Sequence, residues 1–181
     1  MRLFIGIELS QSVKESLFVV QQQLKPYSIK GKFTSPKNFH LTLEFIGEAT
    51  EKEIEVYKTI ISSVAEVSSS FVVSLDHIGK FIQKNKSILW AGPSTAYSLN
   101  KLYDRLHVEF SSRYLEMDKK QYTPHITLGR NIVLNDSFEQ VKKELHWNAI
   151  PLTIDNITLF ESTHINGHLV YRAIEKQQMA F

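Results

Sequence analysis

The first half of the chain begins with an apolar run, continues with apolar positions at helical spacing, and then has a second apolar run. Residues 2–8 form an apolar segment that predicts a strand, and the apolar positions that follow recur at helical spacing behind a capping serine, Ser10 or Ser12. Pro26 ends this helix, because proline lacks the amide N–H that a helix interior needs. A lysine-rich loop then leads to a second predicted strand over residues 39–46.

The pattern continues with a helix and two strands. The segment Thr50-Glu51-Lys52-Glu53 has the form of a capping box, in which the first and last side chains bond each other's backbone N–H, and it opens a second helix. Two strands are predicted next, over 71–81 and 87–91, with a turn around Asn85.

The second half follows the same order. Pro93-Ser94 starts a third helix, and a polar loop then leads to a strand that ends near Arg130. The elements predicted after it are a helix over 137–145, strands over 152–162 and 168–175, and a turn at Asn166-Gly167.

The order helix, strand, helix, strand, strand therefore occurs twice, over residues 10–92 and 93–177. Residues 74–81 also align with residues 153–160, which indicates an internal pseudo-repeat. The repeat predicts a single domain over residues 1–181, made of two related lobes. Lobes of this kind pack with a cleft between them, which is a common setting for a small-molecule or phosphate site.

Composition limits the class of protein. The chain has 181 residues, of which 43% are hydrophobic, and this is enough for the core of one domain. No apolar run is long enough for a membrane-spanning helix, and Glu8 interrupts the N-terminal run too early for a secretory signal. The absence of cysteine excludes disulfides and thiolate chemistry, and it fits a cytoplasmic protein.

The net charge of +2 is too small to indicate nucleic-acid binding by itself. The position of the lysines says more, because several precede the strands at 39–46 and 125–130 and others surround a predicted hairpin. We expect a basic rim around the cleft. Its candidate residues are Lys30, Lys32, Lys37, Lys80, Lys84, Lys86, Lys119 and Lys120.

Two copies of the phrase His-x-Thr-Leu carry the clearest chemistry. They begin at His40 and His125, and each lies in a predicted strand. Side chains at i and i+2 share one face of a strand, so His40 lies beside Thr42, and His125 beside Thr127. An imidazole titrates near neutral pH, so one histidine can act as a base and the other as an acid. Each hydroxyl can donate a hydrogen bond to an anionic oxygen.

This constellation suits hydrolysis of a five-membered cyclic phosphate on a ribose. Water attacks phosphorus in line with the leaving oxygen, so a base and an acid must stand on opposite sides of the phosphorus. Two histidines on opposing lobes meet this need. A zinc site or a catalytic serine triad fits less well, because neither motif has a second ligand two residues away and no Gly-x-Ser-x-Gly elbow is present.

The sequence resembles the two-histidine phosphoesterase superfamily, which is defined by paired His-x-Thr/Ser motifs. Within it, the chain is similar to the RNA 2',3'-cyclic phosphodiesterases, also called 2'-5' RNA ligase-like proteins. The segments that carry the resemblance are 2–7, 40–47, 89–92 and 122–130, and the last is the most specific.

The resemblance implies an α+β fold with two antiparallel sheets facing the cleft and helices outside. It also implies that no metal or other cofactor takes part, and that cyclic phosphate ends are opened to 2'-phosphates. Carried over by position, His40 is the expected proton donor and His125 the proton acceptor. Thr42 and Thr127 are the expected phosphate ligands.

Further residues are candidates for substrate contact. Arg130 follows His125 by five positions, so an ideal strand would aim it at the opposite face, and a bulge near Gly129 is needed to turn it toward a phosphate. Phe33 and Tyr122 are candidates to stack on a base. Core packing is expected for Phe45 and Trp90.

Two alternatives stay open. The same cleft would also suit 2'-5'-linked oligonucleotides or an ADP-ribose cyclic phosphate, or it would belong to a non-catalytic nucleotide- or RNA-binding module. Two intact motifs argue against a pure binding module, because binding needs no poised acid and base. The expected partners are RNA ends or small cyclic nucleotides, with no membrane and no obligate protein partner.

Overall fold

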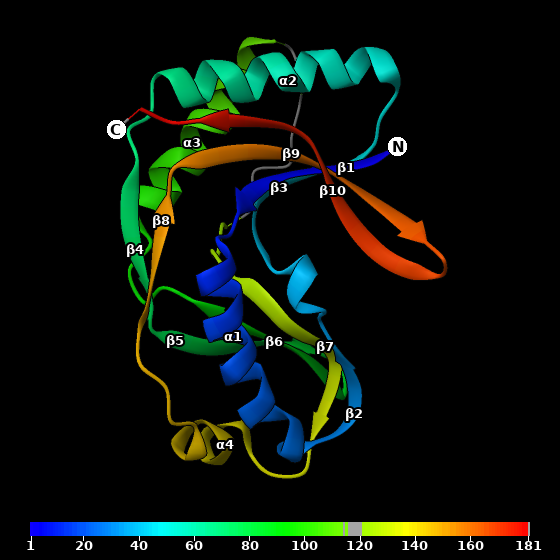
Figure 1. The fold of residues 1–181 in the computed structure, drawn as a ribbon, viewed down its shortest axis with the longest axis vertical. Coiled ribbons are helices and arrows are strands. Elements are labelled where there is room, and N and C mark those ends of the chain that lie inside the picture. The colour runs from blue at the N-terminus through cyan, green and yellow to red at the C-terminus, as the bar shows by residue number, and fades with distance from the viewer. Residues whose placement is uncertain (114, 116–120, 181) are drawn as a thin grey trace.

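Two four-stranded antiparallel sheets form the frame of the protein (Figure 1). The structure is a computed structural model that describes residues 1–113, 115 and 121–180. The first sheet has the order β10-β9-β1-β3 and the second the order β2-β7-β6-β5. Their strands are β1 (Arg2–Glu8), β2 (Ser28–Phe33), β3 (His40–Glu48), β5 (His77–Gln83), β6 (Lys86–Gly92), β7 (Ile126–Leu134), β9 (Asn156–Ile165) and β10 (His168–Gln178).

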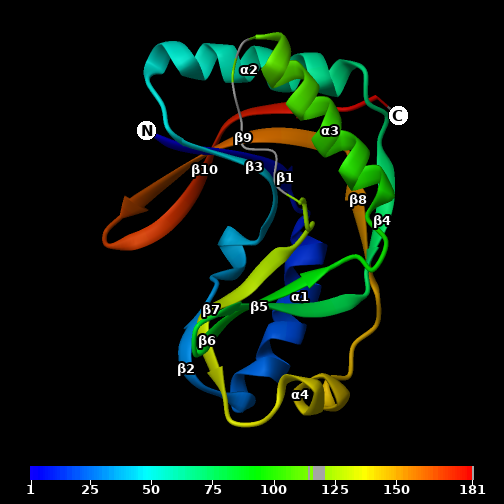
Figure 2. The same ribbon diagram turned by 180° about the vertical axis from the view of Figure 1, so that it is seen from behind.

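Helices lie on the outside of both sheets, as predicted (Figures 1 and 2). The long helices α2 (Glu51–Glu66) and α3 (Tyr97–Ser112) cover the first sheet, and α1 (Gln11–Leu24) and the short α4 (Phe138–Glu144) lie with the second. Apolar side chains from the inner faces of sheets and helices form a large buried core. The predicted α+β architecture is therefore confirmed. No helix in the described part of the chain is long and apolar enough to cross a membrane.

Two predicted strands are each broken at an aspartate, at Asp76 and at Asp155. The stretch predicted over 71–81 divides into β4 (Phe71–Leu75) and β5, and the stretch predicted over 152–162 divides into β8 (Ile150–Ile154) and β9. At the first break, the Asp76 carboxylate accepts hydrogen bonds from the Ser94 amide and hydroxyl at 2.7 and 2.8 Å. The breaks let β4 pair with β8 as a separate ribbon, while β5 and β9 join different sheets.

As a result, each sheet takes strands from both halves of the sequence. The hairpin of β5 and β6 from the first half joins β7 through β6, and the hairpin of β9 and β10 from the second half joins β1 through β9. The two halves are thus interleaved in space. The division of the chain near residue 92 stays a prediction from sequence symmetry.

Local signals predicted the element ends with mixed success. The Thr50 capping box and the Ser10 cap are confirmed, and Asn166 and Gly167 form the predicted turn with positive φ angles of 51° and 77°. The prediction of a lysine-rich loop before the first motif strand was wrong, because part of that segment forms β2 by pairing with β7. The predicted start of the third helix was also wrong. Ser94 bonds to Asp76, and α3 begins only at Tyr97.

A buried glutamine joins α1 to the second sheet. Gln21 is 1% exposed, and its side-chain amide donates to the Thr34 and Leu128 carbonyls at 2.7 and 2.9 Å. Because Leu128 belongs to the second His-x-Thr-Leu phrase, this contact fixes the strand that carries His125.

We predict that Gln21→Ala lowers the free energy of unfolding by about 1–3 kcal/mol, because it leaves buried carbonyl groups short of a donor. Gln22→Ala is the matched control, since Gln22 is the exposed neighbour on the same helix. Urea unfolding followed by circular dichroism measures both. Equal effects of the two substitutions would show that the Gln21 contact has no special role.

Candidate active site

The two His-x-Thr phrases lie on neighbouring strands of different sheets. His40 is the first residue of β3, and His125 directly precedes β7. Thr42 and His125 line one pocket, and the charges of His40 and His125 act on each other. The fold therefore brings the two motifs together, as the repeat predicted.

Both imidazoles are held by the same hydrogen bond. The Nδ1 atom of His40 lies 2.7 Å from the Asn38 carbonyl, and Nδ1 of His125 lies 2.7 Å from the Thr123 carbonyl. A carbonyl oxygen only accepts, so Nδ1 must carry the proton in each ring. In the neutral ring, Nε2 is then the basic nitrogen. Within the described residues, neither Nε2 atom has a hydrogen-bond partner.

Asn38 connects His40 to the hairpin of β9 and β10. Its side-chain amide donates to the Leu169 carbonyl at 2.8 Å, and the Asn38 side chain is buried. The hydrogen bond to Leu169 therefore holds Asn38, whose backbone carbonyl orients His40. No local pattern predicts this contact, because 131 residues separate the two partners.

A bulge follows the threonine in each motif. In β3, Thr42 lies opposite Gly6 and Glu44 lies opposite Ile5, so Leu43 is an extra residue. In β7, Thr127 lies opposite Trp90 and Gly129 lies opposite Leu89, so an extra residue again follows the threonine. Each bulge reverses the alternation of side chains further along its strand.

The bulges bring Phe45 and Arg130 to the cleft. Both residues follow a motif histidine by five positions, and ideal alternation would have sent them to the opposite face. The inward turn suggested for Arg130 is therefore present. The expectation of core packing was wrong for Phe45, which is 59% exposed, and it is confirmed for Trp90, which is 8% exposed.

The charge of Arg130 acts on both motif histidines. The pKa of His40 is lowered from 6.5 to about 4, chiefly by burial; the hydrogen bond to the Asn38 carbonyl opposes this shift, and the charges of Arg130, His125 and Lys14 add to it. Burial also lowers the pKa of His125, with Arg130 acting in the same direction. One guanidinium group therefore lies within electrostatic reach of both imidazoles.

Aromatic rings enclose each imidazole. His40 lies 4.7 Å from the rings of Phe4 and Tyr171, and His125 lies 4.9 Å from the ring of Phe81. The sequence did not single out Tyr171 or Phe81. The repeat held a signal for Phe81, because it aligns with Phe160, whose ring lies 6.2 Å from His40.

A pocket of about 290 Å³ opens beside His125. Its lining includes Thr42, Phe45, Phe81 and Tyr122, and its volume is close to the lower end of small-molecule sites. Tyr122 stacks on Tyr103 with ring centroids 4.5 Å apart and donates its hydroxyl to the Thr42 carbonyl at 3.0 Å. Tyr122 therefore forms part of the pocket wall, and Tyr103 already covers one face of its ring.

The structure does not bring Phe33 into this pocket. Phe33 pairs with Gly129 in β2 and packs against the core, with the Lys25 ammonium 5.9 Å from its ring. Lys80 likewise turns away, since its ammonium lies 5.0 Å from the Phe138 ring. Lys119 and Lys120 lie outside the described residues.

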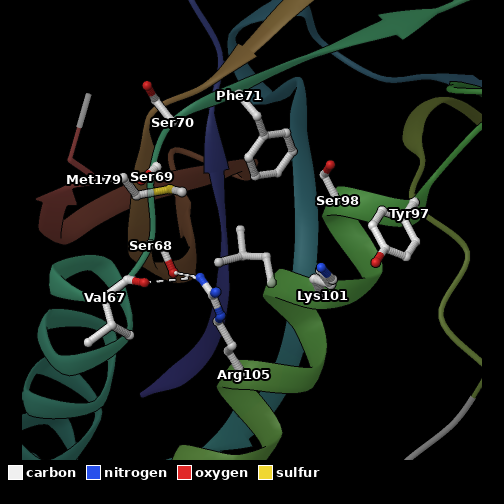
Figure 3. Close-up of a pocket in the computed structure, with 11 residues that line it drawn as sticks. Val67, Ser68, Ser69, Ser70, Phe71, Tyr97, Ser98, Lys101, Arg105 and Met179 are labelled. Carbon is white, nitrogen blue, oxygen red and sulfur yellow. Dashed lines mark hydrogen bonds between the residues drawn. The ribbon is translucent and has the colours of Figure 1, made fainter.

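A second hollow of similar size lies on the far side of α3 and has no such chemistry (Figure 3). It measures about 300 Å³ and contains no histidine. Its Arg105 donates to the Val67 carbonyl and the Ser68 hydroxyl at 3.1 and 3.0 Å, which ties α3 to the end of α2. Size does not separate the two hollows, so the histidines decide which one is the candidate site. Among the described residues, no cluster of three His, Asp or Glu side chains could hold a metal ion.

Comparison with known proteins identifies the family of the chain. A model of the 2'-5' RNA ligase superfamily matches residues 21–165. The chain belongs to this superfamily. The resemblance carried by the two motifs is thereby confirmed.

Relatives of this superfamily member match nearly its whole length. A protein from Thermotoga maritima named RNA 2',3'-cyclic phosphodiesterase is 27% identical, covering 98% of this chain and 95% of the relative. One of the same name from Thermus thermophilus is 30% identical, covering 97% and 89%. The crystal structure of E. coli LigT complexed with 3'-AMP has a TM-score of 0.79 at 20% identity, over 98% of this chain and 97% of that one. This last likeness shows a shared fold.

The lowered pKa of His40 makes the free energy of unfolding depend on pH. The unfolded chain binds a proton at His40 below about pH 6.5, whereas the folded chain binds it only near pH 4. Between these values the unfolded state binds more protons, so the free energy of unfolding falls as the pH falls.

The free energy of unfolding of the native protein falls between pH 7 and pH 4.5. We predict that this fall is smaller by about 2 kcal/mol in His40→Gln. Urea unfolding at both pH values gives this difference for the native protein and the variant. His146→Gln, at an exposed position, is the control. The same acid destabilisation in native protein and His40→Gln would contradict the assignment.

Proposed function

We propose that this protein hydrolyses the 2',3'-cyclic phosphate of RNA or nucleoside ends to a 2'-phosphate, without a metal ion, and that it acts in the cytoplasm. The observation that carries the proposal is the pair of imidazoles whose Nδ1 protons are tied to the Asn38 and Thr123 carbonyls. This arrangement leaves two Nε2 atoms for proton transfer. Relatives named RNA 2',3'-cyclic phosphodiesterase support the choice of substrate.

In the attacking half of the reaction, His125 is the base. A water molecule approaches phosphorus from the side opposite the 3' oxygen, and neutral Nε2 of His125 takes one of its protons as the new P–O bond forms. The pKa of His125 is lowered by burial, so the ring is neutral at physiological pH and ready to accept.

In the leaving half, His40 is the acid. The P–O3' bond breaks, its electron pair stays on the 3' oxygen, and Nε2 of protonated His40 supplies the proton that makes the 3' hydroxyl. Burial and Arg130 keep the pKa of His40 low in the free protein. The anionic phosphate offsets these effects when it binds, because a negative charge beside an imidazole raises its pKa.

Charge on the phosphate is stabilised by donors on the cleft. The Thr42 and Thr127 hydroxyls and the Arg130 guanidinium are assigned to the non-bridging oxygens, where charge grows in the transition state. Arg130 lies on the second sheet, and the equivalent position on the first sheet is Phe45, so the two lobes are not chemically equivalent.

We predict turnover of adenosine 2',3'-cyclic phosphate in the presence of excess chelator, with 2'-AMP as the product. Phosphorus NMR distinguishes the products. A dominant 3'-phosphate would show the reversed pose of the sugar, and activity that only added divalent metal restores would contradict metal-free catalysis.

His40→Ala and His125→Ala should each lower kcat by at least about 100-fold, because each removes one proton-transfer group. His146→Ala is a control at an exposed position. Circular dichroism checks that the variants fold. Near-native turnover in either catalytic variant would remove that histidine from the mechanism.

A further inference from the structure

The two sides of the catalytic centre differ in chemistry. On the His125 side lies the aromatic pocket described above, with Phe45, Phe81 and Tyr122 in its lining. On the His40 side lies a smaller groove of about 60 Å³, whose lining includes Lys14, Lys37, Asn38 and Tyr171. We call this hollow beside His40 the basic groove.

Each lysine of the basic groove is available to a ligand. Lys37 is exposed, and Lys14 is half-buried at the start of α1. Among the described residues, neither lysine has a carboxylate partner. Glu8 also lines the groove, but its carboxylate already pairs with Lys176 at 2.9 Å. The unpaired charge in the groove is therefore positive.

Volume separates what the two hollows can take. The basic groove has space for about two water molecules, given roughly 30 Å³ for each. Its small size and its two ammonium groups suit a phosphate better than a nucleobase. The aromatic pocket is almost five times larger, at about 290 Å³, and offers apolar ring surface.

We propose that an RNA end binds across the centre with one polarity, with its terminal base in the aromatic pocket and the phosphate on its 5' side on Lys14 and Lys37. This inference rests on the proposed cyclic phosphodiesterase activity. It assigns the basic groove to an internucleotide phosphate of the substrate.

Ribose stereochemistry connects this polarity to the reaction. The base is attached to C1', next to C2', and the 5' carbon is attached to C4', next to C3'. If the 3' oxygen faces the acid His40, the 5' phosphate extends on the His40 side and the base extends toward His125. The positions of the basic groove and the aromatic pocket match this orientation, and the opposite orientation would place a base in the smaller hollow.

The charges that act on the two histidines support the same assignment. The charge of Arg130 acts on both histidines and does not distinguish the two sides. The charge of Lys14 acts on His40 and is not among the causes that shift His125. The cation that distinguishes the two histidines, Lys14, therefore lies on the His40 side, where Lys37 also lines the basic groove.

The test compares adenosine 2',3'-cyclic phosphate with the same compound carrying a 5'-phosphate. We expect the 5'-phosphate to lower KM by about tenfold in the native protein, and this preference to shrink as salt is raised. In the double variant Lys14→Ala/Lys37→Ala, the ratio of the two KM values should approach one. The double variant Lys52→Ala/Lys143→Ala is the matched control, because both lysines are exposed on outer helices, and it should keep the native ratio.

Phe45→Ala should instead weaken binding of both compounds by a similar factor, since both carry the same base. An unchanged KM ratio in Lys14→Ala/Lys37→Ala, or no preference for the 5'-phosphate in the native protein, would overturn the proposed polarity. Hydrolysis of neither compound would instead contradict the proposed function. The two failures are therefore distinguishable.

Discussion

Two equivalent hydrogen bonds, one at each motif histidine, determine the chemistry of the site. The Nδ1–H of each motif histidine donates a hydrogen bond to the carbonyl two residues earlier, at Asn38 and Thr123. The bond fixes the tautomer and the direction of the ring, and it leaves Nε2 as the nitrogen that can exchange protons. The Asn38 bond to Leu169 and the aromatic walls at Tyr171 and Phe81 hold the rings in this state.

The paired bulges are the second constraint on the site. In a regular strand, the histidine and the threonine would face the cleft, but the residue five positions after the histidine would point to the opposite face. The extra residue in each strand brings Phe45 and Arg130 to the same cleft. Buried polar groups fix both strands from the helix side. Gln21 donates to the Leu128 carbonyl, and His107 pairs with Glu44 at 2.7 Å.

Short-range patterns predicted the parts of the fold that depend on short-range physics. The Thr50 capping box and the two His-x-Thr faces were correct because neighbours in the sequence decide them. The splits at Asp76 and Asp155, the strand β2 and the exposed Phe45 were missed, because each depends on pairing with a distant strand. The bulge near Gly129 was predicted only as a requirement for Arg130. The position of Phe33 was not predictable from its neighbours, since its pairing with Gly129 fixes which face it takes.

The central claim is that His40 and His125 have different roles, as acid and base. A cyclic phosphate in which sulfur replaces the bridging 3' oxygen tests it most directly, because a thiolate leaves without needing a proton. We expect His40→Ala to recover most of the lost turnover on the sulfur substrate, while His125→Ala stays impaired. Equal impairment of both variants on the oxygen and sulfur substrates would contradict this assignment.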